Sequence, residues 1–229
     1  MKNNRVLLRR VNRQAFTWVG LPLVAIGGWF YPMLGFLLFG CMLGAVGLSF
    51  FRGRNWCDWM CPRGAFLDLA LGPISRKITI PKFFRHEAVR AFMVLLIFTV
   101  IGVQFYLNWG NLSAMGLALV RVLTVTTVVG ILLGWGIHPR TWCHICPMGT
   151  VAHWIARGKK PLTAGSNCVS CGLCARACPM QLAPNEFGKD GSRDHSDCLR
   201  CSSCVYSCPK KALSFGDGSS DIKECRHAA

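Results

Sequence analysis

Eight cysteines in two short runs restrict what this chain can fold into more than any other feature. Each run reads C-x2-C-x2-C-x3-C-P, and the second run begins nineteen residues after the first ends. With this spacing, three thiolates of each run hold one [4Fe–4S] cluster and the fourth reaches the other cluster. Structural zinc sites use two pairs of cysteines, so zinc and disulfides are disfavoured. The predicted sites are Cys168, Cys171, Cys174 and Cys208 for one cluster, and Cys198, Cys201, Cys204 and Cys178 for the other.

The rest of the chain is both apolar and basic. Hydrophobic residues make up 52% of the 229 residues, yet the formal net charge is +16. The two properties are segregated, because the apolar residues lie mostly before residue 138 and the basic residues flank the apolar stretches. Basic chains often bind nucleic acid, but no basic stripe with interleaved aromatic residues is present. Nucleic acid is therefore not an expected partner.

Four apolar stretches predict four transmembrane helices. Their approximate bounds are residues 14–30, 33–51, 88–107 and 115–137. The two outer turns contain no Lys or Arg, whereas the amino-terminal arm, the middle segment and the carboxy-terminal part hold nearly all of them. By the positive-inside rule, we expect a multi-pass protein of the inner (cytoplasmic) membrane with both termini in the cytoplasm. The lipid bilayer is thus one expected partner.

These patterns predict an α-helical membrane protein whose four helices form two repeated hairpins, followed by a small two-cluster domain. The predicted domains are a basic cytoplasmic arm at 1–13, a membrane domain at 14–160, the two-cluster domain at 161–215 and a polar tail at 216–229. The chain has fourteen cysteines and no small-residue cleavage site after its first apolar stretch. A reducing compartment is therefore expected for the clusters.

A second cysteine motif is repeated within the membrane domain. The pattern W-C-x(2,3)-C-P-x-G occurs after the second predicted helix, with Cys57 and Cys61, and after the fourth, with Cys143 and Cys146, about 85 residues later. A parallel repeat of a hairpin plus this motif implies a pseudo-twofold axis along the membrane normal. Such an axis would bring the four cysteines together at the inner membrane face.

Three chemistries remain open for these four cysteines. They can hold a third metal centre, either a single iron or an iron–sulfur cluster. They can instead be two redox-active dithiols, with thiolates favoured by the nearby Arg54, Arg63 and Arg140. In the third reading they only shape the loops. The shared Trp and Pro-x-Gly disfavour that last reading, because unrelated loops would not repeat them.

Four short spans, two W-C…C-P motifs and two terminal [4Fe–4S] motifs together resemble the NapH-type membrane ferredoxins, a group that includes MauN and the carboxy-terminal part of NosR. The resemblance covers nearly the whole chain. It implies a quinol dehydrogenase subunit of an oxidoreductase complex, which passes electrons between the quinone pool and another redox protein. The implied cofactors are two [4Fe–4S] clusters, with quinone as an exchangeable substrate. The spacing of Cys143 and Cys146 departs from the family's usual C-x3-C-P by one residue.

Quinol oxidation also requires a proton acceptor near the membrane interface. The candidates are His86 before the third predicted helix, His138 after the fourth, and His144 within the second cysteine pair. Arg121 lies inside the fourth predicted helix, where an ionisable residue is costly and often functional. It is a further candidate for binding quinone, or else an anionic lipid headgroup.

Two other classes of function are compatible with the sequence. The chain can be an assembly or maturation factor that reduces a metal ion or a disulfide through its Cys-Pro motifs, or a scaffold in which the clusters only stabilise a docking surface. Quinone-dependent reduction of the clusters distinguishes the electron carrier from both.

Overall fold

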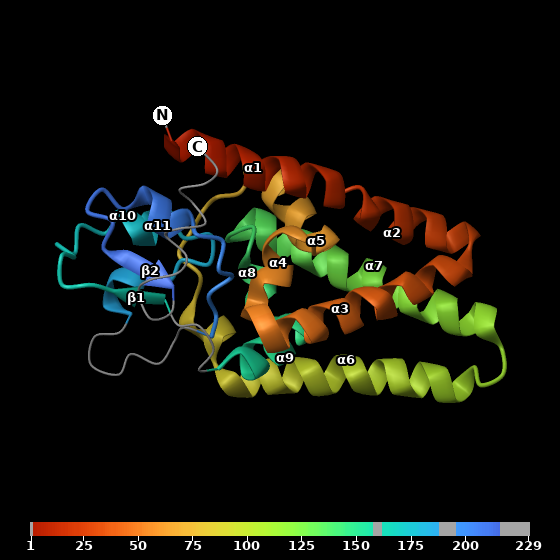
Figure 1. The fold of residues 1–229 in the computed structure, drawn as a ribbon. Helices are drawn as coiled ribbons and strands as arrows, with labels where there is room; N and C mark the ends of the chain where they lie inside the picture. The colour runs from red at the N-terminus through yellow and green to blue at the C-terminus, as the bar shows by residue number, and fades with distance from the viewer. Residues whose placement is uncertain (1, 158–161, 188–195, 216–229) are drawn as a thin grey trace.

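The structure, a computed structural model, describes residues 2–157, 162–187 and 196–215. The predicted polar tail at 216–229 lies outside these residues. The described chain is a bundle of apolar helices with a small, loop-rich part at one end, in which the two cluster motifs lie (Figure 1).

The first half of the bundle contains three longer helices, α1 to α3, and several short helical segments. Their bounds are α1 (Lys2–Thr17), α2 (Gly20–Phe30), η1 (Pro32–Phe36), α3 (Leu37–Arg52), η2 (Gly53–Asn55), α4 (Trp56–Trp59), α5 (Pro62–Phe66) and η3 (Leu67–Leu71). The second half consists of η4 (Lys82–Arg85), α6 (Glu87–Leu107), α7 (Leu112–Gly136), α8 (Thr141–Ile145) and α9 (Pro147–Ala156). Each half thus ends in two short helices that carry one Cys-Pro motif.

Among the described residues, three helical stretches are long and apolar enough to cross a membrane. They are Pro32–Leu71, Glu87–Leu107 and Leu112–Gly136. The predicted span at 14–30 is divided in two, because α1 ends at Thr17 and α2 has only 11 residues. Pro22 has no amide hydrogen for the carbonyl of Trp18, which instead accepts from Leu21. Since α2 alone rises only about 16 Å, the repeat of two complete hairpins remains a prediction.

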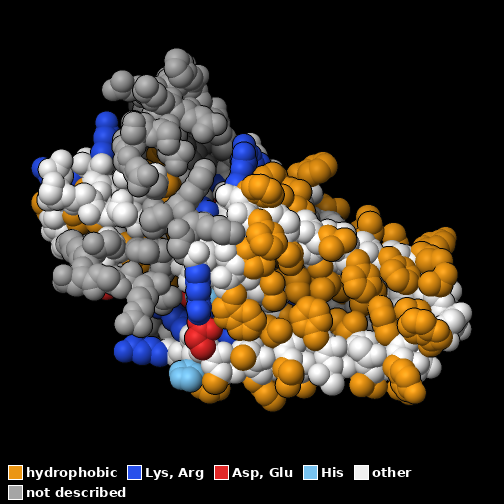
Figure 2. All heavy atoms as spheres, turned by 60° about the horizontal axis from the view of Figure 1, so that its bottom comes forward, with side chains coloured by type: hydrophobic (Ala, Val, Ile, Leu, Met, Phe, Trp, Pro, Cys, Tyr) orange, Lys and Arg blue, Asp and Glu red, His pale blue; other side chains and the backbone are white. Residues whose placement is uncertain are grey.

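Close backbone contacts hold the helices together. A Cβ on Gly35 would clash with the carbonyl of Gly116 in α7, and a Cβ on Gly116 would clash with the carbonyl of Pro32. Small residues of this kind let helices approach closely in membranes, where lipid is as apolar as Leu and hydrophobic burial gives little drive. On the face drawn in Figure 2, hydrophobic side chains gather over the helices, and Lys and Arg gather toward the end next to the ferredoxin-like part. This surface fits association with a membrane.

The small terminal part is built mainly from loops. It contains β1 (Leu162–Ala164), α10 (Leu173–Arg176), η5 (Pro184–Glu186), α11 (Ser203–Ser207) and β2 (Leu213–Phe215). The two strands pair antiparallel, with Leu162 opposite Phe215. Its buried core combines Leu162, Met180, Leu182, Phe187, Leu199 and Leu213 with cysteines of both motifs. This part is therefore a ferredoxin-like domain in which the cysteines belong to the core.

Candidate iron–sulfur sites and the membrane junction

The two cluster loops share an unusual local conformation. Ser170 and Gly172 in the first loop, and Arg200 and Ser202 at the corresponding positions of the second, all have φ between +52° and +73°. Residues other than glycine rarely adopt this left-handed conformation, which marks an imposed backbone shape. Here it curls each loop so that its first three cysteines surround one space.

Each curled loop encloses a cavity together with one cysteine from the other motif. One cavity is lined by Cys178, Cys198, Cys201 and Cys204, and the other by Cys168, Cys171, Cys174 and Cys208. Each has a volume of about 340 Å³, part of it open to solvent. Each cavity is thus lined by one of the two sets of four cysteines that the sequence predicts as cluster ligands.

The donors around these cavities fit [4Fe–4S] clusters. Four thiolates are the usual ligand set of a cubane, and the remaining lining is mostly apolar, with Met180, Leu182 and Phe187 in one cavity and Val169 and Leu213 in the other. Backbone amides also point at sulfur. The amide of Arg200 donates to Cys198 Sγ and that of Ala212 to Cys208 Sγ, both at 3.4 Å. Such bonds favour the thiolate form that binds iron.

The two Cys-Pro motifs form matching loops at the ends of the apolar helices. In each, the second cysteine is extended, with ψ of 112° at Cys61 and 128° at Cys146, and the following proline starts a helix. This is the expected geometry, because proline disfavours helical conformation in the preceding residue and suits the first helical position. We refer to residues 54–64 and 140–149 as the first and second Cys-Pro loops.

Each Cys-Pro loop contributes an arginine that binds the opposite loop. Arg54 of the first loop donates to the carbonyl of Cys143 at 2.8 Å, and Arg140 of the second donates to the carbonyl of Cys57 at 2.7 Å. Each guanidinium also lies against the glycine of the opposite Pro-x-Gly, Gly149 for Arg54 and Gly64 for Arg140. Both arginines lie three residues before the first cysteine of their motif, so the contacts obey the symmetry that the repeat implies.

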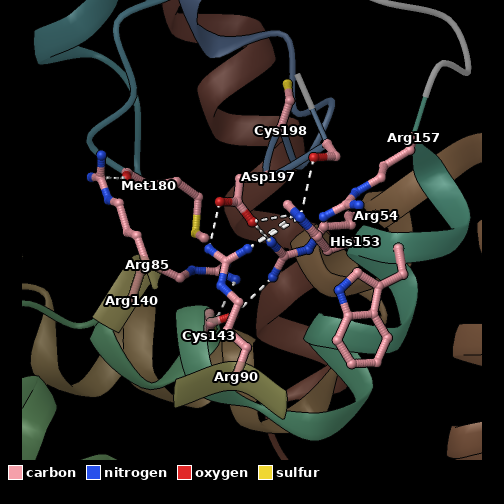
Figure 3. A network of polar contacts seen from close by, with 12 residues as sticks. Arg54, Arg85, Arg90, Arg140, Cys143, His153, Arg157, Met180, Asp197 and Cys198 are labelled. Carbon is pink, nitrogen blue, oxygen red and sulfur yellow. Dashed lines mark hydrogen bonds and ion pairs between the residues drawn. The ribbon is translucent and has the colours of Figure 1, made fainter. Parts of the chain in front are cut away.

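The carboxylates that balance these arginines come from different parts of the chain. Asp68, just beyond the first loop, accepts from Arg140 Nε at 2.7 Å and from Nη2 at 2.5 Å. Asp197, in the ferredoxin-like domain, accepts from Arg54 at 2.6 Å. It also accepts from Arg90 at 2.6 Å and lies 2.9 Å from His153 (Figure 3). Arg54, Arg90, His153 and Asp197 form a buried group that we call the Asp197 network.

Asp197 is ionised in this setting. Burial alone would raise the pKa of its carboxyl, but the hydrogen bond with His153 and the charges of Arg54 and Arg90 outweigh that effect and lower the pKa. The network therefore holds a fixed negative charge between two cations, one residue before Cys198.

The cysteines of the two Cys-Pro loops lie near enough to one another to interact electrostatically. Cys57 and Cys143 pack against the core of the ferredoxin-like domain, whereas Cys146 packs beside Trp142. Within the described ranges, no three Cys, His, Asp or Glu side chains converge as ligands of a single ion do. Burial raises the pKa of Cys143, which disfavours a reactive thiolate there.

The four quinone-binding candidates lie in different environments. His144 is buried, and neither ring nitrogen has a hydrogen-bond partner among the described residues. Burial lowers its pKa to about 3. His138 is half-buried, and its Nδ1 accepts from the amide of Arg140 at 3.3 Å. His86 caps the amino terminus of α6, and Arg121 is exposed on α7. Of these four, only His144 lies within the second Cys-Pro loop and only His138 adjoins it.

Sequence reasoning missed most of the polar network. Asp68, Arg90, His153 and Asp197 were not singled out by any motif. One signal was available, because a chain with only 10 acidic residues and 26 basic ones has few acids to spare. An acid next to a predicted cluster ligand, such as Asp197, is then a candidate partner for a repeated arginine.

Comparison with known proteins places the chain among its relatives. A family described as a 4Fe-4S binding domain matches residues 34–81 and 120–163, and a 4Fe-4S dicluster domain matches residues 167–213. The methylamine utilization ferredoxin-type protein MauN of Methylobacillus flagellatus is 31% identical over 163 residues, 64% of this chain and 56% of that protein. These matches support a relationship to the NapH/MauN-like ferredoxin-type membrane proteins.

Further relatives come from Methanocaldococcus jannaschii. One uncharacterized protein is 30% identical over 151 residues, 62% of this chain and 58% of that protein, and another is 27% identical over 155 residues, 62% of this chain and 65% of that protein. The chain thus spans little more than half of the length of MauN and of the first archaeal relative. No solved structure matches it significantly.

The similarity to NapH/MauN-like proteins agrees with the geometry. The two segments matched by the 4Fe-4S binding domain each include one Cys-Pro loop, and the dicluster match covers both cluster motifs. The chain is therefore an iron–sulfur protein of the ferredoxin type that is related to MauN, and its apolar helices suit association with a membrane.

Proposed function

We propose that this protein transfers electrons between the quinone pool of the cytoplasmic membrane and a partner redox protein, as a quinol dehydrogenase subunit with both termini in the cytoplasm. One observation carries the proposal: Cys57 and Cys143, at the ends of the apolar helices, pack against the same core as Cys174 and Cys204. Groups bound at these cysteines would lie between the lipid-facing helices and the exposed end of the ferredoxin-like domain.

Two [4Fe–4S] clusters are the proposed resident cofactors, one in each four-cysteine cavity. When bound, they accept and release single electrons. The chain supplies the thiolates, the amide donors to sulfur and an apolar wall that limits access of water. Hydrogen bonds to sulfur and burial are among the properties by which proteins set cluster potentials.

A third iron–sulfur centre is proposed for Cys57, Cys61, Cys143 and Cys146. Desolvation raises the pKa of the Cys143 thiol, which argues against a reactive thiolate in a free dithiol, and hence against the alternative of a disulfide or metal-ion reductase in assembly of another enzyme. Buried polar groups nearby also lack partners: the indole N–H of Trp142 and the two ring nitrogens of His144, one of which carries a hydrogen, have none among the described residues. Buried polar groups normally do have partners, and inorganic sulfide would provide them.

His138 is the strongest candidate for accepting a proton from quinol. It is partly open, next to the second Cys-Pro loop, and burial lowers its pKa, so it is neutral and able to accept a proton at pH 7. Asp68 and Arg140, which face it, are held by their own ion pair. His144, His86 and Arg121 remain secondary candidates.

The test is the iron and acid-labile sulfide content of anaerobically purified protein, compared with a variant in which Cys57, Cys61, Cys143 and Cys146 are all serine. We expect more than about eight irons per chain in the natural protein and about eight in the variant. About eight in both would exclude the third centre. Short-chain ubiquinol or menaquinol should reduce the clusters of the natural protein, and failure of both quinols would refute the quinol dehydrogenase role.

A further inference from the structure

The ferredoxin-like domain meets the helices through the loop that carries Cys198. Asp197, one residue before it, binds Arg54 and Arg90 (Figure 3). Arg200, two residues after it, lies with its guanidinium directly against Gly53, where φ is +60° and a Cβ would clash. Residues on both sides of Cys198 thus contact the membrane part beside the first Cys-Pro loop.

The other cluster loop faces away from the helices. Its helix α10 packs on α11 and η5 within the domain, and it lies beyond α11 as seen from the bundle (Figure 1). Cys171 is exposed, and Val169 and Leu173, which line the same cavity, are 63% and 42% exposed. α11, by contrast, contacts α1 of the bundle.

We infer that the two cluster sites have a fixed order. The site of Cys178, Cys198, Cys201 and Cys204 is proximal to the membrane and exchanges electrons with the Cys-Pro loops. The site of Cys168, Cys171, Cys174 and Cys208 is distal and exchanges electrons with the soluble partner. This order rests on the proposed electron-transfer function. Each quinol oxidised to quinone releases two protons and two electrons, and the electrons pass one at a time to a one-electron acceptor protein.

Asp197 is the positioning residue of the proximal site. A continuous path of covalent and hydrogen bonds runs from the Cys143 carbonyl through the guanidinium of Arg54 and the carboxylate of Asp197 to Cys198. Both side chains are 1% exposed, so water does not compete for these bonds. The same contact fixes the distance between the proximal site and the second Cys-Pro loop.

Membrane proximity can be tested without any quinol. Full-length holoprotein carrying Cys171→Ser or Cys201→Ser, each retaining about four ferredoxin irons, is reconstituted in vesicles containing nickel-chelating lipid. Power saturation of the EPR signal then reports how strongly nickel relaxes the remaining cluster. We expect stronger relaxation in C171S, which keeps the proximal site. Equal relaxation, or stronger relaxation in C201S, would overturn the order.

Reduction by short-chain quinol tests the path in the same variants. The cluster kept in C171S should be reduced at nearly the natural rate, whereas the one kept in C201S should be reduced about tenfold more slowly or worse, although dithionite reduces both. Equal rates would contradict the order. Failure of quinol to reduce even the natural protein would refute the proposed function, while the relaxation experiment would still decide the order.

Asp197→Asn tests the positioning role with all cysteines in place. We expect slower reduction by quinol and a higher midpoint potential for the proximal cluster, which is the cluster that C201S lacks, since a negative charge beside it is removed. Asp197→Glu should restore both properties in part. The matched control is Glu87→Gln, at the half-exposed outer end of the same network, where Glu87 contacts His153 but not Arg54. Equal potential shifts in both clusters, or the same shift in E87Q, would refute the role of Asp197.

Discussion

The two Cys-Pro loops have the same local geometry, but the carboxylates that neutralise their buried arginines come from different parts of the chain. In the first half of the chain Asp68 supplies the carboxylate for Arg140, and Arg10 and Gln14 of α1 bind the same carboxylate. In the second half the position corresponding to Asp68 is His153, which has no fixed negative charge. The missing carboxylate comes from Asp197 of the ferredoxin-like domain.

This difference teaches how an internal repeat can acquire a docking site. Replacing one of two equivalent acids with histidine leaves a buried arginine without a counter-ion, and a buried unpaired charge is very unfavourable. Only a domain that supplies a carboxylate can pack on the Cys-Pro loop that carries this arginine. The half of the chain with Asp68 stabilises the membrane part by itself. The half with His153 needs Asp197, and it therefore specifies where the ferredoxin-like domain packs.

The largest effect should come from removing the acids. Asp197→Ala leaves both Arg54 and Arg90 buried without a carboxylate, and we expect it to lower the free energy of unfolding by about 3–5 kcal/mol. Asp68→Ala should cost less, because only Arg140 loses its partner while Arg10 keeps Asp58. Thermal unfolding of the holoprotein in detergent measures both. A larger loss for D68A would reverse our comparison.

A smaller, compensating effect should follow from making the second half resemble the first. In the double variant His153→Asp with Asp197→Asn, a carboxylate replaces the ring that lies 3.2 Å from Arg90. We expect recovery of about half of the stability that D197N alone loses, since one charge is again paired within the membrane part. The cluster potential should remain shifted, because the charge beside Cys198 is not restored. Recovery of the potential would show that Asp197 does not act locally.

Glycine substitutions test the part that the halves share. A Cβ on Gly64 would lie 3.0 Å from Arg140 Nη1, and one on Gly149 would lie 2.9 Å from Arg54 Nη2. Alanine at either position should therefore lower stability by about 1–3 kcal/mol through overpacking. The control is Gly40→Ala in α3, where a Cβ meets open space. Unequal losses at Gly64 and Gly149 would argue against equivalent loops.

The smallest effect concerns pH. Burial lowers the pKa of His138, opposed by Asp68 and reinforced by Arg140 and Lys77. As the pH falls below about 6.5, the unfolded chain takes up a proton that the folded state resists, so stability declines. His138→Asn should remove this part of the decline, by less than about 1 kcal/mol. Unfolding midpoints of both proteins at pH 7.5 and 5.5 measure it, and an identical pH dependence would contradict the assignment.

The sequence predicted the parts of this molecule that depend on local spacing. Each of two cavities is lined by one of the two sets of four cysteines that the spacing predicts, because curled loops of fixed length determine which thiolates can meet. The break between α1 and α2 was missed, since apolar composition does not reveal where Pro22 interrupts a helix. The Asp197 network was also missed, because Arg54 and Asp197 lie 143 residues apart and no periodic pattern connects them.

The short pairing of β1 with β2 has a consequence for biosynthesis. The strands join residues 162–164 to residues 213–215, and each cluster cavity needs cysteines from both motifs. The distal cavity cannot be complete until Cys208 has left the ribosome, and the lining of the proximal cavity, whose last cysteine is Cys204, also includes Phe215 of β2. Iron loading is therefore expected as a late, post-translational step, and a chain truncated before Cys208 would carry both cluster loops but lack one ligand of the distal cluster.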